Sequence, residues 1–247
     1  MSKCESALMV LTTTESKWLI AKALLKLDQV EQALAEGYLL LAGGTTNGYL
    51  AQELTGREID PLQYTVGRVA EGNLGVTDPE SRIKPLVFKD GQPIEADFSQ
   101  VLPLLGPDDV FIKGANAIDL AGHAGILVSS PDGGTIGRAW GTLAAKGVNL
   151  ILPVGLEKLI PSVEAAARVC GQGRFNYATG SSCGLVPITN GLVFTELEAL
   201  ELLFGVEAIQ VAAGGQGSCQ GAVVVAIHGA GENVEAAFNF VERELKG

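Results

Sequence analysis

Short apolar runs that end in glycine-rich polar turns, two of them followed by a helical pattern, constrain the fold of this chain most strongly. The clearest is LLLAGGTTNGYLAQEL, residues 39–54, whose first run is apolar at every position. Strands of that kind are buried on both faces, as in a parallel sheet. Two more such turns, KGANAID at 113–119 and PDGGTIG at 131–137, also follow apolar runs. Strands that alternate with helical patterns predict an α/β fold.

Capping-box spacings mark where several helices are expected to begin. TTTE at 12–15, DQVE at 28–31 and TELE at 195–198 each place a short polar side chain three residues before a glutamate. Near residue 155 the pattern changes, and the later strands and helices follow an order typical of a smaller α+β unit. We therefore expect two domains, residues 1–155 and residues 156–247.

Composition argues against several classes of function. With 17 basic and 28 acidic residues the formal net charge is −11, which does not suit a nucleic-acid surface. No apolar run approaches the roughly 20 residues that cross a bilayer, and we find no secretory signal. We therefore expect a cytoplasmic protein without a membrane partner. The four cysteines lie far apart without metal-ligand spacing, so we expect no metal and no other cofactor.

The turn at residues 43–48 is a candidate anion site. A strand that ends in glycines and enters a helix leaves backbone N–H groups pointing outward at the positive end of the helix dipole. Gly44 lets a ligand approach the backbone closely, and Thr45, Thr46 and Asn47 add short side chains that can donate to phosphate or carboxylate oxygens. In open α/β sheets, ligands lie at this edge of the strands.

The other two turns add candidates at the same edge, if all three strands are parallel. Lys113 follows an apolar run and would supply positive charge. Asn116 and Asp119 would orient hydroxyl groups of a ligand. The third turn would close the opposite side of the crevice with Gly133, Gly134 and Thr135. The sequence therefore predicts one cradle for negative charge, built from three turns.

Residues 14–158 resemble ribose-5-phosphate isomerase and its relatives. LLLAGGTTNGYLAQEL is similar to the first phosphate loop of that family, in which a strand ends in a GTGST-type loop before an apolar helix. DVFIKGANAIDLAG resembles the next segment, which ends in DGADEID, and GGTIGRAWGTLAAKGVNLILPVGLEKL resembles the turn, helix and strand that follow. The similarity extends to glucosamine-6-phosphate deaminases, sugar-regulator ligand domains and CoA transferases.

This resemblance implies a Rossmann-like, mostly parallel sheet with helices on both faces and a small lid-like α+β unit. It also implies that the ligand is a sugar phosphate. The family motif is acidic where this chain has Lys113, Asn116 and Ala117, and only Asp119 remains acidic. Because aldose–ketose isomerisation needs a base, usually a carboxylate, we expect altered chemistry with Lys113 and Asp119 as the catalytic candidates.

Three hypotheses of function remain. The first is an isomerase-like enzyme that binds a small anionic metabolite, with Asp132 or Glu157 as other possible bases. The second is a non-catalytic metabolite sensor or assembly protein on the same scaffold. The third is CoA or acyl transfer, for which Glu157, Cys183 or Cys219 would be the nucleophile. The apolar content fits a homo-oligomer in each case.

Overall fold

The largest sheet has six strands and is mixed. The computed structural model describes residues 3–246. The strand order of this sheet is β12-β10-β7-β2-β5-β6, with parallel pairing from β12 to β2 and antiparallel pairing of β2 with β5 and of β5 with β6. The chain is thus a mixed α/β protein, as expected. The strands are β2 (Tyr38–Leu41), β5 (Leu86–Lys89), β6 (Gln92–Ile94), β7 (Val110–Ile112), β10 (Asn149–Pro153) and β12 (Leu192–Phe194).

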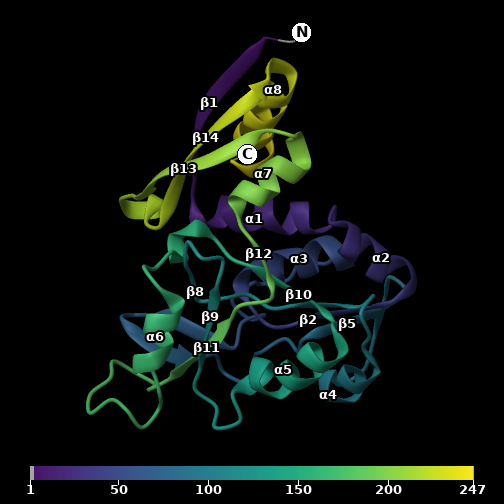
Figure 1. Ribbon diagram of the computed structural model, residues 1–247, viewed down its shortest axis with the longest axis vertical. Coiled ribbons are helices and arrows are strands. Elements are labelled where there is room, and N and C mark those ends of the chain that lie inside the picture. Colours follow the sequence, from purple (N-terminus) through teal and green to yellow (C-terminus); the bar gives the residue numbers. More distant parts are fainter. Residues whose placement is uncertain (1–2, 247) are drawn as a thin grey trace.

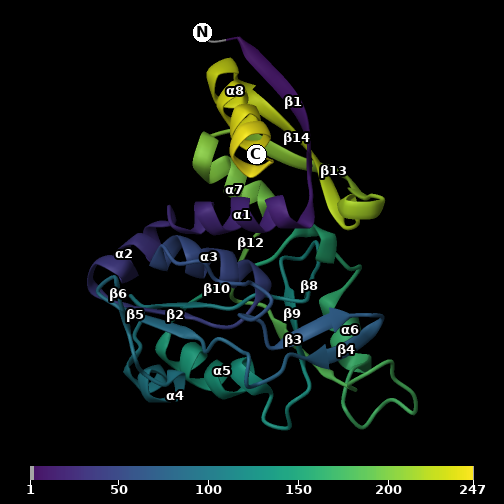
Figure 2. The same cartoon turned by 180° about the vertical axis from the view of Figure 1, so that it is seen from behind.

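Helices cover both faces of this sheet (Figure 1). One face carries α1 (Thr13–Leu24), α2 (Asp28–Glu36) and α3 (Thr45–Thr55), and the other carries α4 (Phe98–Val101) and α5 (Gly134–Lys146). Figure 2 shows the same layers from behind. Four further short helical turns are Leu102–Leu104, Leu156–Lys158, Gly217–Cys219 and Val241–Leu245.

Two of the three predicted capping boxes are confirmed. Thr12 and Glu15 form the box that starts α1, and Thr195 and Glu198 form the one that starts α7 (Glu196–Phe204). The box predicted at residues 28–31 is wrong, because the N-cap of α2 is Leu27, whose side chain cannot accept a hydrogen bond from the helix. The spacing there places acidic residues in the first helical turn, where their negative charge interacts favourably with the helix dipole but does not cap the helix.

Two smaller antiparallel sheets lie beside the carboxyl ends of the parallel strands. One contains β8 (Ala117–Ile118), β9 (Ala124–Val128) and β11 (Gly184–Ile188), and α6 (Val163–Val169) packs on it. The other is the hairpin of β3 (Gly67–Ala70) and β4 (Asn73–Val76), visible in Figure 2. The expectation that all three polar turns follow strands of one parallel sheet is therefore wrong for the third turn. It follows β9, which folds back on β8 as an antiparallel hairpin.

The first strand belongs to a fourth sheet and not to the six-stranded sheet that follows it in sequence. β1 (Cys4–Leu11) pairs antiparallel with β14 (Ala222–Ala230), which pairs with β13 (Glu207–Gly214). α8 (Gly231–Phe240) packs on this sheet, and α1 lies between it and the six-stranded sheet (Figure 1). Because β12 belongs to the six-stranded sheet, strand pairing crosses residue 155 in both directions. A domain boundary at that residue gains no support from the pairing.

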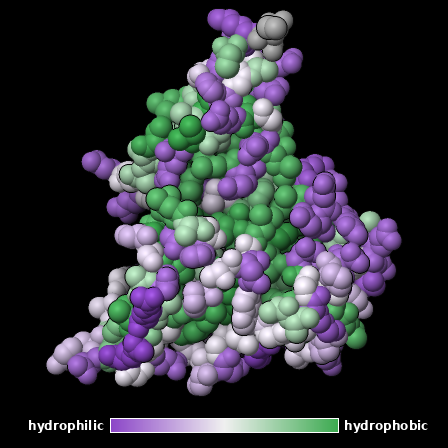
Figure 3. Space-filling model, in the orientation of Figure 1, coloured by the Kyte–Doolittle hydropathy of each residue, from purple (hydrophilic) through white to green (hydrophobic). Residues whose placement is uncertain are grey.

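The outer face of this fourth sheet is apolar and exposed. Leu8 and Val10 of β1 are 64% and 43% exposed, and Ile209 and Val211 of β13 are 55% and 54% exposed. Leu8 and Ile209 both pair with Ala226, so they lie on the same face. Figure 3 shows the hydrophobic area on this upper part of the molecule. The homo-oligomer remains a prediction.

The hydrophobic core lies between the six-stranded sheet and the helices on its two faces. Leu39 and Leu41 of β2, Phe111 of β7 and Leu152 of β10 are fully buried, as the continuous apolar runs predicted. No helix within residues 3–246 combines the length and hydropathy that a membrane span requires.

Tyr64 joins the parallel and antiparallel parts of the six-stranded sheet. Its buried hydroxyl donates to the Leu41 carbonyl at 2.7 Å and accepts from the Leu86 N–H at 3.0 Å. Burial raises the pKa of this hydroxyl well above its ordinary value. We expect Tyr64→Phe to lower the free energy of unfolding by about 2 kcal/mol, because two buried backbone groups lose their partner. Urea denaturation measures this loss.

Tyr38→Phe is the matched control, since no hydrogen bond from the Tyr38 hydroxyl is present within residues 3–246. Equal losses in the two variants would contradict the bridging role of Tyr64.

Candidate functional site

A cavity of about 500 Å³ opens at the carboxyl ends of β2, β7 and β10. Its floor is made by the loops that follow these strands. The β3–β4 hairpin and β9 form its walls. The parallel strands therefore bring loops that are far apart in the sequence to one hollow, as expected for an open α/β sheet.

Eight of the ten predicted site residues line this cavity. They come from all three polar turns, although β9 is not a strand of the large sheet. They are Gly44, Thr45, Thr46, Lys113, Asn116, Gly133, Gly134 and Thr135. The two others, Asn47 and Asp119, are not in the lining.

Asn47 is a structural residue, and its prediction as a ligand contact has no support. The side chain is fully buried, and Nδ2 donates to the carbonyls of Ala42 at 2.7 Å and Ile112 at 3.2 Å. These carbonyls lie just after β2 and at the end of β7. The amide therefore fixes the start of α3 against the neighbouring strand.

Asp119 also has a structural position, and its prediction as a catalytic residue has no support. Oδ1 accepts from the N–H groups of Ala121 at 3.0 Å and His123 at 3.1 Å, and Oδ2 accepts from the Val163 N–H at 2.8 Å. Burial acts against its ionisation, but these hydrogen bonds hold its pKa below the usual value. Its oxygens thus hold the β8–β9 turn to the start of α6 rather than facing a ligand.

Three cations in the lining were not predicted. They are Lys17 from α1, Lys158 from the loop after β10, and Arg68 from β3. Lys158 follows a buried parallel strand, as Lys113 does, so the same reasoning would have found it. Lys17 and Arg68 carry no local signal, because their segments reach the cavity only through tertiary packing.

The charge of the cavity is the opposite of that of the chain. Its lining contains no aspartate or glutamate, although acidic residues outnumber basic ones by 28 to 17. The ion pairs formed within residues 3–246 involve none of Lys17, Lys113, Lys158 and Arg68. Surface lysines can remain unpaired in water at little cost, but half-buried ones lose solvation. These charges are therefore available to an anion.

The surroundings of the lysines show that solvation loss. Burial, and then the neighbouring Lys158 charge, lower the pKa of Lys113 to about 8. Burial also lowers the pKa of Lys17, while Glu157 and Glu196 act in the opposite direction. Nζ of Lys113 donates to the carbonyls of Gly43 at 3.4 Å and Gly114 at 3.2 Å. Backbone carbonyls thus hold the ammonium in place without neutralising it.

The N-terminus of α3 adds backbone donors to these cations. Its N-cap, Gly44, has no side chain to cap the helix, and no acidic residue lies in its first turn. The first N–H groups of a helix have no intrahelical partner. Within residues 3–246, the hydroxyls of Thr45 and Thr46 make no hydrogen bond, and both residues line the cavity. The three features together form a site for a negatively charged group.

The start of α5 contributes less to this site. Gly133 and Gly134 have φ values of 73° and 61°, which explains why glycine occupies both positions. Oδ1 of Asp132 accepts from the Gly134 N–H at 2.8 Å, so this N–H group is not available to a ligand. The carboxylate is itself outside the lining, so it does not serve there as a base.

Apart from Arg68, the walls of the cavity are mainly apolar. They carry Leu74 and Val76 of β4 and Ile126 and Val128 of β9. Cys183 also lies there, and burial raises the pKa of its thiol, which disfavours the reactive thiolate. The cavity therefore combines a cationic floor with an apolar wall.

Glu196 is a buried carboxyl group just behind the floor. Oε2 accepts from the Leu156 N–H at 3.0 Å, whereas Oε1 has no partner. Burial raises the pKa of this carboxyl to about 7. It was not predicted, since the sequence marks it only as the first residue of a capped helix.

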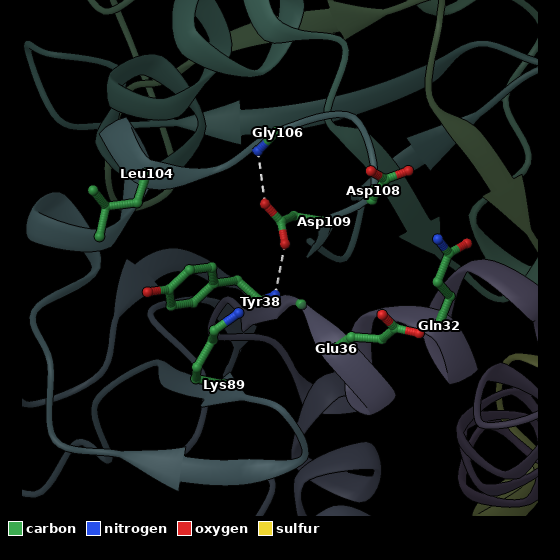
Figure 4. A pocket seen from close by; sticks show the side chains of 9 residues that line it. Gln32, Glu36, Tyr38, Lys89, Leu104, Gly106, Asp108 and Asp109 are labelled. Atoms are coloured by element: carbon green, nitrogen blue, oxygen red, sulfur yellow. Dashed lines mark hydrogen bonds between the residues drawn. The ribbon is translucent and has the colours of Figure 1, made fainter.

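A second hollow, at the opposite end of the strands, has three acidic side chains in its lining (Figure 4). Asp109 accepts from the N–H groups of Tyr38 at 2.6 Å and Gly106 at 2.7 Å. Lys89 lies over the Tyr38 ring and pairs with Asp90. Glu36 and Asp108 also line this hollow and form no ion pair within residues 3–246, so its free charges are negative. The cavity at the carboxyl ends is therefore the better candidate for an anion.

No group of three or more His, Cys, Asp and Glu side chains within the described residues could hold a metal ion.

Comparisons with known proteins add no relative to this description. No protein-family model, curated protein or solved structure matches the chain.

Replacing Lys113 is expected to stabilise the protein. Its pKa of about 8 lies below the ordinary 10.5, so the charged form is penalised in the folded state at all pH values below 8. We expect Lys113→Met to raise the free energy of unfolding at pH 7 by about 1 kcal/mol, discounted for its partial exposure. The difference shrinks as the pH rises from 8 towards 10.5. Urea denaturation at pH 7 and pH 10 tests both statements.

Lys146→Met, at the exposed far end of α5, is the control and should change stability little. A loss of stability in Lys113→Met would show that the ammonium supports the fold instead.

Glu196 is expected to make stability depend on pH. Its pKa of about 7 exceeds the ordinary 4.5, so the folded state loses stability as the pH rises from 4.5 to 7. We expect Glu196→Gln to be more stable than the parent by about 2 kcal/mol at pH 8 and by little near pH 4.5. Melting temperatures across this range give the comparison, with Glu201→Gln on the exposed side of α7 as control. A pH-independent difference would contradict the assignment.

Proposed function

We propose that the cavity at the carboxyl ends of β2, β7 and β10 binds a small anionic metabolite, and that this ligand is a sugar phosphate. The observation that carries the proposal is the lining of four cations, Lys17, Arg68, Lys113 and Lys158, without a single carboxylate. Lys17, Lys113 and Lys158 are half-buried, so their unpaired charges remain costly until an anion enters, whereas Arg68 is exposed and adds positive charge at little cost.

The ends of the cavity suit different parts of that ligand. The phosphate would lie on the N–H groups and hydroxyls of Thr45 and Thr46, with the lysines around it. Asn116 accepts from the Leu127 N–H at 3.0 Å through Oδ1, which leaves its Nδ2 for a sugar hydroxyl. The resemblance to ribose-5-phosphate isomerase supports the same class of ligand. The Rossmann-like sheet that it implies is part of this proposal, supported by the four parallel strands.

A metabolite sensor without turnover is the second candidate. It is favoured by the lack of a carboxylate in the lining, since an isomerase would need a base there. CoA or acyl transfer through a glutamate gains no support, because Glu157 lies outside the lining.

Inorganic phosphate and ribose 5-phosphate test the proposal by calorimetric titration. We expect both to bind and neutral ribose not to bind. Lys158→Gln is expected to raise the dissociation constant for phosphate about 10-fold, the effect of one lost charge-assisted hydrogen bond.

Lys146→Gln removes the same charge at the other end of α5 and should leave the dissociation constant unchanged. If the two lysine variants weakened binding equally, the effect would be one of net charge and not of this cavity. Turnover of ribose 5-phosphate would favour the enzyme over the sensor.

A further inference from the structure

The backbone of Lys113 is fixed by strand pairing, and its ammonium group has only neutral partners. Its backbone N–H donates to the Ile151 carbonyl at 3.0 Å, which extends the pairing of β7 with β10. Its Nζ contacts the neutral carbonyls of Gly43 and Gly114 and forms no ion pair within residues 3–246. A carboxylate partner would hold the proton on this nitrogen, whereas these acceptors do so only weakly.

The surroundings favour the neutral amine. Burial and the charge of Lys158 lower the pKa of Lys113 to about 8, so a large share is uncharged under mildly alkaline conditions. Lys158 is held nearby, because its Nζ donates to the Ala115 carbonyl at 3.1 Å. Lysines beside a second cation or in an apolar pocket are the ones that react with carbonyl carbons.

Nζ also lies beside the expected position of the phosphate. Gly43, whose carbonyl accepts from Nζ, directly precedes the N-cap of α3, and Thr45 begins the helix. A phosphate on this N-terminus would hold a short carbon chain next to the amine. The apolar side chains of β4 and β9 would then enclose that chain.

We propose that Lys113 captures the carbonyl group of a phosphorylated aldehyde or ketone as an imine. The inference rests on the proposed function, because the phosphate site positions the carbonyl carbon. The neutral amine adds to this carbon and forms the C–N bond. The nitrogen then transfers both of its protons to the former carbonyl oxygen, which leaves as water. The step needs neither an oxidant nor a reductant, and an open-chain sugar phosphate carries both of the groups that it requires.

Borohydride trapping with pyridoxal 5′-phosphate tests the inference. This probe joins an aldehyde to a phosphate, and borohydride reduces its imine to a stable secondary amine that peptide mass spectrometry locates. We expect most of the label on Lys113 at pH 8, at least 10-fold less total label in Lys113→Arg, and protection by excess inorganic phosphate. The rate of labelling of Lys113 should rise with an apparent pKa near 8.

Label spread evenly over surface lysines, or concentrated on Lys17 or Lys158, would overturn the assignment. Calorimetric titration with phosphate separates the two ideas. Phosphate binding without trapping at Lys113 would refute imine formation and leave the proposed function standing. If phosphate failed to bind, the proposed function would fail, and any labelling would lack the anchor on which this inference depends.

Discussion

The parallel pairing of β2, β7 and β10 is the constraint on which the rest of the structure depends. It brings the ends of strands that are separated by more than a hundred residues to one edge of the sheet. Asn47 fixes this arrangement locally, because one amide group donates to carbonyls at the ends of both β2 and β7. The distance between the start of α3 and the side chain of Lys113 is therefore set by backbone pairing and one buried hydrogen-bond donor. A site built on such elements needs little reorganisation when a ligand arrives.

Electrostatics divides the molecule into a negative exterior and a positive cavity. The acidic surface keeps large polyanions away, whereas an ion small enough to enter meets four cations and an uncapped helix. The low pKa of Lys113 and the raised pKa of Glu196 are two costs of this arrangement. Proteins carry such costs mostly where function requires them, since better-solvated or apolar side chains would give a more stable fold.

Local signals in the sequence predicted local structure well. The continuous apolar runs became buried strands, and the boxes at Thr12 and Thr195 became helix starts. The three polar turns meet at one cavity, although β9 reaches it from a different sheet. Residues that reach the cavity only through long-range packing could not be predicted from the sequence. Lys17 and Arg68 enter the cavity from α1 and β3, and no spacing in the sequence links them to the turns. Asn47 and Asp119 illustrate the opposite error, because a side chain that ties loops together has the same composition as one that binds a ligand.

The pairing of β1 with β14 has a consequence for the order in which the molecule is assembled. The Ser6 hydroxyl and the His228 ring, which lie 3.0 Å apart across these strands, are separated by 222 positions along the chain. Contacts of such large sequence separation carry a high loop-closure cost and tend to form late in folding. α1 follows β1 directly and carries Lys17. Because α1 also packs on α3, the late pairing of the chain ends adds the sheet of β1, β13 and β14 to a helix whose place beside the cavity is fixed by other contacts.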